Sequence, residues 1–358
     1  MSTGERLELI KEVGEEIIEE EELKRLLEEG KELTAYDGFE PSGKIHIAQG
    51  LLKAVNVNKM TRVGIRFKMW VADWHAFANN KMGGDLIKIQ TVGRYFIEVW
   101  KASGMDLKKV EFVWASETLK DPNYWKLVLQ IAKTNSIKRF IRTAEIMGRA
   151  ESDDLTAAQI IYPCMQIADI FTLGAQITQL GMDQRKVNVL AREIGEILGF
   201  WKPVIVSHHM LMGLSRPPEK TLNKTQRAIG LKMSKSLPDS AIFMTDSPDE
   251  IERKIGKAYC PPSQVEENPI LEYCRYIVFE KVEEMIIPRQ EEHGGNLKVG
   301  SYQELQSLYQ ENKIHPQDLK KSVANYLNQF LAPVRDHFEN DNEAKKLKEE
   351  VESYTITR

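Results

Sequence analysis

Two short segments of the chain carry the side chains best suited to chemistry on a phosphate group. The first is the segment 231–237, in which Lys232 and Lys235 stand among serines behind Gly230. A lysine ammonium on its flexible stem can follow negative charge as it moves among phosphate oxygens during a reaction. For a single pair of lysines at this spacing, a solvated loop is the alternative. The interpretation therefore depends on a second segment.

The second segment covers residues 41–50 and is centred on His46. It lies between a predicted strand and a predicted helix, where free backbone N–H groups favour anions. An imidazole there can donate a hydrogen bond to phosphate oxygens that gain charge in a transition state. Gly43 would let a nucleotide approach the backbone closely. Together the two segments predict adenylate chemistry, with His46, Lys232 and Lys235 as catalytic residues.

The same segment also contains most of a phosphate-binding P-loop motif. Gly38, Gly43 and Lys44 occupy three of its positions, but Ile45 stands where the motif needs a serine or threonine to ligate Mg²⁺. Pro41 also removes one backbone N–H from the loop. We therefore reject a P-loop nucleoside triphosphatase as the function.

A polar stripe lies on an otherwise apolar helix, predicted over residues 156–173. Tyr162, Gln166 and Asp169 lie at positions i, i+4 and i+7, which form one face of a helix. Either this stripe meets water on a partly exposed helix, or it is buried and satisfied by a polar ligand such as an amino acid. The spacing alone leaves both alternatives open.

A sheet must position these residues, because short apolar segments alternate with longer helical ones. The predicted strands cover residues 34–39, 66–72, 110–114, 175–180 and 203–207. One predicted helix follows the first strand and ends near residue 60, and three others cover 84–103, 156–173 and 184–198. Strands that alternate with helices of this length favour a parallel sheet with right-handed crossovers. The predicted fold class is therefore α/β: a Rossmann-like, doubly wound parallel sheet with a helical insertion, followed by an all-α C-terminal domain.

The composition and hydrophobic pattern of the sequence divide the chain into three regions. Residues 1–30 are predicted to be a charged amphipathic N-terminal helix. Residues 31–240 form the predicted catalytic domain, with the helical insertion at about 115–155. From residue 241 to residue 358 the sequence is almost entirely helical in pattern, so we expect a separate helical domain there.

The bulk composition is that of a soluble globular protein. Of the 358 residues, 42% are hydrophobic and 28% are charged, with a net charge of −4, which argues against a general nucleic-acid coat. No stretch has the roughly 18 apolar residues that a membrane span needs, and the acidic N-terminus is unlike a targeting signal. Three cysteines without metal-ligand spacing are typical of a reducing compartment. We therefore expect a cytoplasmic protein with no membrane contact and no dedicated metal site.

Five motifs in register give this sequence a resemblance to a known family. Residues 36–44, 162–169, 181–186, 232–236 and 315–320 are similar to those of tyrosyl-tRNA synthetases of the archaeal and eukaryotic cytosolic type, within class I aminoacyl-tRNA synthetases. The resemblance extends from about residue 30 to about residue 340. One departure stands out, because the histidine motif usually ends in Gly-His and here ends in Ala48-Gln49. Gln49 can donate a hydrogen bond but cannot carry positive charge.

The resemblance implies a tyrosine–tRNA ligase, which activates L-tyrosine with ATP to tyrosyl-adenylate and passes the tyrosyl group to the 3′ end of tRNA(Tyr). Mg²⁺ would arrive with the ATP. Tyr36 and Asp169 would recognise the phenolic hydroxyl, because a carboxylate accepts hydrogen bonds and a tyrosine hydroxyl can do both. The other implied site residues are Tyr162, Gln166 and Gln184 for the ammonium and carboxylate of tyrosine, Asp183 for the ribose, and Gly43, His46 and Lys235 for the rest of ATP.

Two other functions compete with this one. A tryptophan-specific synthetase shares the architecture, but a donor–acceptor pair tuned to a phenol suits indole poorly, because indole only donates. An inactive relative that serves as an RNA-binding or scaffold protein would normally lose His46 or the lysine segment, and both are present.

The resemblance also implies macromolecular partners. The C-terminal domain is expected to read the tRNA(Tyr) anticodon through His293, which could stack on a base, and Asp318, which could accept from both N–H groups on the edge of guanine. We also expect a homodimer, because apolar positions of the insertion have no obvious partner in the sheet. These positions are Trp125, Leu127, Val128 and Ile131. The segment 73–76, after the second strand, is expected to form pocket wall rather than to take part in chemistry.

Overall fold

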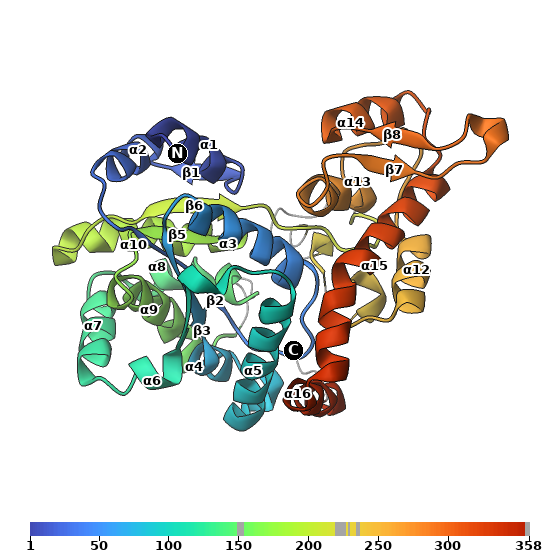
Figure 1. The fold of residues 1–358 in the computed structure, drawn as a ribbon. Helices are drawn as coiled ribbons and strands as arrows, with labels where there is room; N and C mark the ends of the chain where they lie inside the picture. Colours follow the sequence, from blue (N-terminus) through green and yellow to red (C-terminus); the bar gives the residue numbers. More distant parts are fainter. Residues whose placement is uncertain (149–153, 219–226, 228–229, 234–236, 355–358) are drawn as a thin grey trace.

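The computed structural model describes residues 1–148, 154–218, 227, 230–233 and 237–354. Its centre is a six-stranded sheet in the order β1-β6-β5-β2-β3-β4 (Figure 1). The strands are β1 (Glu16–Ile18), β2 (Thr34–Phe39), β3 (Arg66–Val71), β4 (Val110–Trp114), β5 (Ile177–Gly181) and β6 (Val204–His208). All neighbouring pairs from β2 to β6 are parallel. The predicted α/β fold class is confirmed.

The strand order reverses at β2. From β2 the chain moves outward to β3 and β4, and then returns to the other side of β2 to form β5 and β6. The helices α3 (Lys53–Arg62), α5 (Leu86–Ala102), α9 (Ala157–Thr172) and α10 (Arg185–Leu198) make the crossovers. In such sheets, ligands bind beyond the carboxyl ends of the strands at the point of reversal. We therefore expect a site at the ends of β2 and β5.

Side chains along β2 alternate between two apolar cores. Ala35 and Phe39 belong to the core that α3 and α5 cover, whereas Tyr36 belongs to the core that α9 and α10 cover. Asp37, whose side chain shares the face of Ala35, is 1% exposed. A buried carboxylate at this position requires a partner.

The N-terminal region differs from the prediction of one helix. It consists of α1 (Thr3–Lys11), the strand β1 and α2 (Glu20–Glu28). The helix is interrupted because Gly14 follows α1 and Glu19 adopts a left-handed conformation with φ of 71°. Between them, β1 pairs antiparallel with β6 and places Glu16 opposite Ser207. The parallel sheet therefore has one antiparallel edge strand.

The helical insertion is present between β4 and β5. It contains α6 (Ala115–Thr118), α7 (Pro122–Ala132), α8 (Ile137–Ile141) and a short 3₁₀ turn η4 (Ala144–Met147) before α9. Its apolar positions were expected to have no obvious partner in the sheet, and Val128 and Ile131 pack on helix α9. Both are buried in the core that α7 shares with α9. Trp125 and Leu127 are partly buried against the same core.

The C-terminal region is mainly helical, with one addition to the predicted all-α domain. Its helices are α12 (Pro248–Lys257), α13 (Pro269–Tyr273), α14 (Tyr302–Gln310), α15 (Pro316–Asn340) and α16 (Asn342–Ser353), and its strands β7 (Met285–Ile287) and β8 (Leu297–Val299) form a small antiparallel sheet. Strands of three residues are too short to show a period of two in the sequence.

The last two helices bring the chain back to the half of the molecule that contains the six-stranded sheet. The long helix α15 runs down beside the sheet domain, and α16 then lies against α5 (Figure 1). Tyr95 on α5 contacts Phe338 on α15 with ring centroids 5.3 Å apart. Glu352 on α16 forms an ion pair with Lys44 at 3.3 Å. Among the described residues, no helix is both long and apolar enough to span a membrane.

Candidate active site

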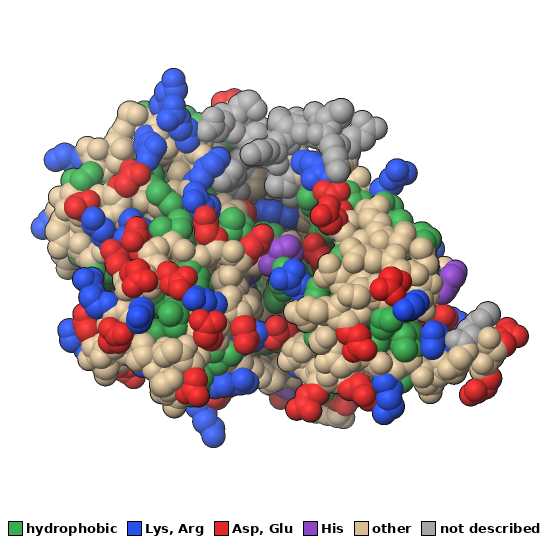
Figure 2. Space-filling model, turned by 90° about the horizontal axis from the view of Figure 1, so that it is seen from above, with side chains coloured by type: hydrophobic (Ala, Val, Ile, Leu, Met, Phe, Trp, Pro, Cys, Tyr) green, Lys and Arg blue, Asp and Glu red, His purple; other side chains and the backbone are tan. Residues whose placement is uncertain are grey.

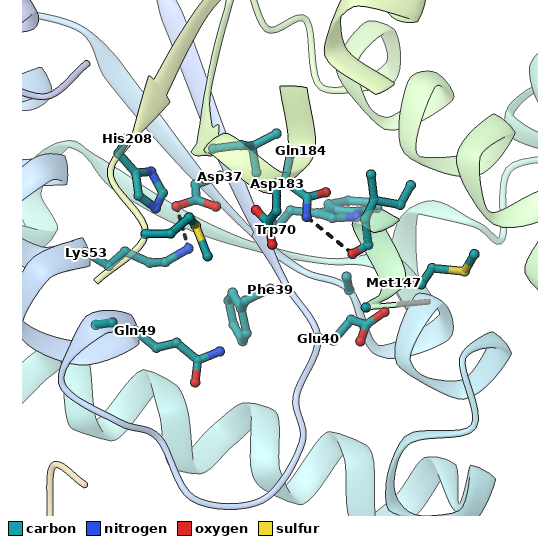
Figure 3. A pocket seen from close by; sticks show the side chains of 18 of the residues that line it. Asp37, Phe39, Glu40, Gln49, Lys53, Trp70, Met147, Asp183, Gln184 and His208 are labelled. Carbon is teal, nitrogen blue, oxygen red and sulfur yellow. Dashed lines mark hydrogen bonds and ion pairs between the residues drawn. The ribbon is translucent and has the colours of Figure 1, made fainter. Parts of the chain in front are cut away.

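A cavity of about 340 Å³ opens at the carboxyl ends of β2, β3, β5 and β6, where the strand order reverses. The close-up in Figure 3 shows side chains from these strand ends and from α3 converging on it. The sequence-predicted residues that line the cavity are Tyr36, His46, Tyr162, Gln166, Asp169, Asp183, Gln184 and Lys232. Residues that lie far apart in the sequence are thus brought together in one place. Seen from above, the molecule is hollowed between its two halves, and basic and histidine side chains gather there (Figure 2).

Four predicted residues are not among those that line the cavity. Gly43 lies beside it, in a turn with φ of 69°, a conformation that favours glycine. Lys235 falls outside the described residues. His293 ends the short 3₁₀ turn η8 (Glu291–His293), and Asp318 lies in the first turn of α15, so both belong to the C-terminal region.

The polar stripe of α9 is buried. Tyr162, Gln166 and Asp169 are 5%, 8% and 1% exposed, so the alternative in which they meet water is wrong. α9 begins with a capping box, in which the Thr156 side chain and the Gln159 side chain satisfy backbone N–H groups reciprocally. This cap fixes the start of the helix and hence the rotation of the stripe toward the cavity.

Asp169 is held on both carboxylate oxygens. The Tyr124 hydroxyl donates to Oδ1 at 2.7 Å, and Nε2 of His75 lies 2.9 Å from Oδ2. Burial alone would lower the pKa of His75, but the Asp169 carboxylate, with Glu40 and Asp73, outweighs it and leaves that pKa raised. The segment 73–76 does line the pocket as expected, and its histidine also contacts the key carboxylate.

Tyr36 faces the same end of the cavity. Its hydroxyl is buried and makes no hydrogen bond of normal geometry with any described residue. Burial raises its pKa well above the usual value, with Asp169 and Asp37 adding to the shift and the nearby Gln166 amide opposing it. The hydroxyl is therefore neutral and able both to donate and to accept. This arrangement matches what a phenolic hydroxyl requires.

The cavity is also lined by Glu40, which the sequence reasoning missed. The Tyr162 hydroxyl donates to Glu40 Oε1 at 2.7 Å, and Lys81 lies 3.5 Å from Oε2. Gln166 donates to Gln184 at 3.0 Å. A carboxylate and two amides at this position suit a ligand that carries both an ammonium and a carboxylate group. The position of Glu40, directly after β2 at the switch point, was the signal that could have identified it.

Backbone hydrogen bonds join the turn around His46 to residues 242–244, which follow the lysine segment. Ile47 N–H donates to Ile242 O, and Met244 N–H donates to Ile45 O, both at 2.9 Å. These bonds hold the turn around His46 against residues that follow the lysine segment. Lys232 itself donates to Asp183 Oδ2 at 2.7 Å. Lys232 thus lies beside Asp183, and both residues line the cavity together with His46.

A buried ion pair also lines the cavity, and the sequence analysis did not predict it. Lys53, at the start of α3, forms an ion pair with Asp37. Close to it, burial and the Lys53 charge lower the pKa of His208 to about 3, so this imidazole is neutral. No group of three or more histidine, cysteine or acidic side chains in the described part of the chain could hold a metal ion.

The fold and the site together define a class I tRNA synthetase, and a comparison with protein families agrees. The family described as class I tRNA synthetases (W and Y) matches residues 28–332. This range contains the five parallel strands β2 to β6, the insertion and most of α15.

Comparisons with individual proteins narrow the assignment within this family. The chain is 53% identical to cytoplasmic tyrosine–tRNA ligase 1 of Arabidopsis thaliana over 99% of this chain and 89% of that one. A solved tyrosyl-tRNA synthetase of Pyrococcus horikoshii, complexed with L-tyrosine, is 39% identical with a TM-score of 0.90, over 98% of this chain and 100% of that one. A Leishmania major tyrosyl-tRNA synthetase complexed with tyrosinol is 44% identical with a TM-score of 0.90. That match covers 99% of this chain but only 61% of the longer Leishmania chain. The chain belongs to the tyrosyl-tRNA synthetases.

Proposed function

We propose that this cavity catalyses tyrosine–tRNA ligation in two steps. In the first, a carboxylate oxygen of L-tyrosine attacks the α-phosphorus of ATP, and pyrophosphate leaves. In the second, a hydroxyl at the 3′ end of tRNA(Tyr) attacks the carbonyl carbon of the adenylate, and AMP leaves. The observation that carries the proposal is the buried Tyr36 hydroxyl, which makes no hydrogen bond of normal geometry with any described residue and lines the cavity together with Asp169.

Tyrosine would lie with its ring toward α9. Asp169 would accept from the phenolic hydroxyl, and the Tyr36 hydroxyl would complete the recognition, because each group has the capacity that the phenol needs. Tyr162, Gln166 and Gln184, with Glu40, would hold the ammonium and carboxylate. The carboxylate is already a competent nucleophile at neutral pH, so the protein would act mainly by positioning.

ATP would occupy the half of the cavity near β5 and β6. Asp183 would accept from the ribose, and the Gly43 turn would allow the nucleotide to approach the backbone. His46, Lys232 and Lys235 would stabilise charge that develops on the phosphates. Mg²⁺ would enter bound to ATP.

The tRNA would bind both regions. We propose a catalytic region over residues 31–240, with the insertion at about 115–155, and an anticodon-binding region over residues 241–358. Arg289 supports this division, because its guanidinium donates to Gly295 O at 3.0 Å and to Lys313 O at 3.3 Å. It thereby ties the turn that holds His293 to the segment that leads to Asp318. Both residues would then read neighbouring features of the anticodon.

A homodimer remains part of the proposal, on different residues from those first considered. Trp74 on α4 (Asp73–Ala78) lies against Trp125 on α7 with ring centroids 6.3 Å apart. One helical turn further along each helix, Phe77 is 51% exposed and Leu129 is 61% exposed. Exposed apolar side chains gathered on two adjoining helices are typical of an interface. We further propose that the protein acts in the cytoplasm, as its Arabidopsis relative's name states for that protein.

ATP–pyrophosphate exchange with each amino acid in turn tests the proposal. We expect exchange to depend on tyrosine, with phenylalanine and tryptophan far weaker. Exchange that depends on tryptophan would instead assign the tryptophan-specific function. Absence of exchange with every amino acid, in a folded protein that still binds tRNA, would favour the inactive relative.

A further inference from the structure

Lys53 is a buried cation in the wall of the nucleotide half of the cavity. It is 7% exposed, and its ammonium forms an ion pair with Asp37, which is 1% exposed. Figure 3 shows Lys53 reaching from α3 toward Asp37, with His208 beside them. Both Lys53 and Asp37 line the cavity. The pair therefore faces the space that a ligand would fill, although it is shielded from bulk solvent.

A buried ion pair is seldom justified by stability alone. Removing two charges from water costs more than their attraction usually returns, and a pair of apolar side chains would often serve better. Here burial raises the pKa of Asp37, with Lys53 opposing the shift and Asp183 adding to it. The nearby Asp183 carboxylate thus adds to the cost of keeping Asp37 charged. An ion pair with such a cost, placed next to a cavity, points to a role in binding or reaction.

Gln49 lies on the same helical face as Lys53, four residues earlier. Its side chain also lines the cavity, and its Oε1 atom is buried with no hydrogen-bond partner among the described residues. Gln49 is neutral and stands where the histidine motif usually has a histidine. The side chain that carries positive charge on this face of the helix is therefore Lys53, one turn further on.

The ammonium of Lys53 keeps hydrogen-bonding capacity for a ligand. It has three N–H donors, and Asp37 is its acceptor in the described structure. A lysine stem is flexible enough for the ammonium to move from Asp37 toward a phosphate without losing its proton. In the first reaction step, one bond forms between the tyrosine carboxylate and phosphorus, and one bond to pyrophosphate breaks. Charge accumulates on the phosphate oxygens during this exchange.

We propose that Lys53 is a further catalytic residue, which contacts the phosphates of ATP during activation and provides the positive charge that Gln49 lacks. Asp37 is its positioning residue and holds the ammonium at the cavity wall before ATP binds. The proposal rests on the function proposed above.

The main test removes both charges, so that no carboxylate is left buried alone. We expect the Lys53→Met/Asp37→Leu variant to form tyrosyl-adenylate about 10²–10³-fold more slowly in single turnovers, as for other lost transition-state donors. Its affinity for tyrosine, measured by equilibrium binding, should be unchanged. Adding Gln49→His should restore part of the rate, because an imidazolium would return a cation to the same face. A wild-type rate in the double variant would overturn the proposal, as would a rate loss that Gln49→His leaves unchanged.

Two further variants separate catalysis from folding. Asp37→Asn keeps the cation and an acceptor for it but removes the negative charge that positions it, so the proposal expects a clearly smaller loss of activation than in the double variant, whereas a purely structural ion pair requires a loss as large as in the double variant. Lys59 is a matched control on the same helix, 7% exposed and paired with Glu12 and Glu280 away from the cavity. Lys59→Met should leave the activation rate per folded molecule unchanged. If wild-type exchange does not depend on tyrosine, the proposed function fails first.

Discussion

Nε2 of His75 and Oδ2 of Asp169 lie 2.9 Å apart, and both side chains are sealed from solvent. With Tyr124 on the other oxygen, the carboxylate has no freedom to turn. A recognition group that is fixed before the substrate arrives loses little entropy on binding, and it cannot adapt to a substrate that lacks the matching hydroxyl. If Asp169 recognises the phenolic hydroxyl as proposed, discrimination depends in part on His75 and Tyr124, which hold that carboxylate.

The first prediction concerns specificity for tyrosine over phenylalanine. A site built to hydrogen-bond a hydroxyl rejects the analogue that lacks it by about 10⁴–10⁵-fold, because its polar groups are left unpaired. Tyr36→Phe should erode this preference, and Tyr36→Phe/Asp169→Leu should erode it further. Ratios of kcat/KM in pyrophosphate exchange measure the effect. A double variant that excludes phenylalanine as strongly as the wild type would show that the phenol binds elsewhere.

The second prediction concerns the rate of activation. His46→Ala should slow adenylate formation by about 10²–10³-fold with little change in tyrosine affinity, because the contact forms mainly in the transition state. Lys235→Ala should act in the same way. Single-turnover measurements with saturating ATP separate the two quantities. Unchanged activation in either variant would remove that residue from the machinery.

The third prediction concerns stability and pH. His209 hydrogen-bonds Glu15 and Glu272 and stacks on Tyr276, so it joins the N-terminal segment to the C-terminal region. Burial alone would lower its pKa, but these carboxylates raise it to about 9. A raised pKa means that the interaction stabilises the fold fully below pH 6.5, the ordinary value, and that this stabilisation is lost as the pH rises through about 9.

We therefore expect the stability difference between wild type and His209→Gln to be larger at pH 6 than at pH 10, in denaturant titrations. The comparison uses the difference between the two proteins because His75 also has a raised pKa and contributes to both. A difference that is equal at the two pH values would mean that His209 carries no charge in the fold.

The fourth prediction concerns the anticodon. Asp318→Ala should leave pyrophosphate exchange nearly untouched, while aminoacylation falls and loses its preference for guanine at the first anticodon base. Asp336→Ala, at an exposed acidic position further along the same helix, is the matched control and should change neither assay. Equal loss in both assays for Asp318→Ala would indicate a structural role.

The fifth prediction concerns assembly. Sedimentation at micromolar concentration should show a dimer for the wild type and a monomer for Phe77→Glu/Leu129→Glu, because a charge cannot be buried in an apolar interface without a partner. A wild-type protein that sediments as a fully active monomer would contradict the proposal.

The sequence predicted those features that depend on local pattern. The five parallel strands and the stripe of Tyr162, Gln166 and Asp169 follow from periodicity, which residues near one another in the chain determine. It failed where a distant partner decides the outcome. Glu16–Ile18 forms a strand because β6 offers it an edge, and Met285–Ile287 forms a strand because Leu297–Val299 pairs with it.

The candidate site shows the same limit. Tyr36 could be placed from its strand and the family resemblance, whereas Lys53 and Glu40 could not. Lys53 matters because it meets Asp37 across the gap between a helix and a strand, and Glu40 because it accepts from Tyr162, which lies 122 residues away in sequence. Neither contact produces a periodic pattern of residue types in the sequence, so neither could be predicted from it.

The return of α16 to α5 has a consequence for the order in which the chain folds during synthesis. The Lys44–Glu352 pair joins residues from opposite ends of the sequence. Contacts between residues so far apart require the closure of very long loops and form late. During translation, the surface of α5 that α16 covers stays open until residues 342–353 have left the ribosome. The sheet of the protein can therefore form before this flank of α5 is covered.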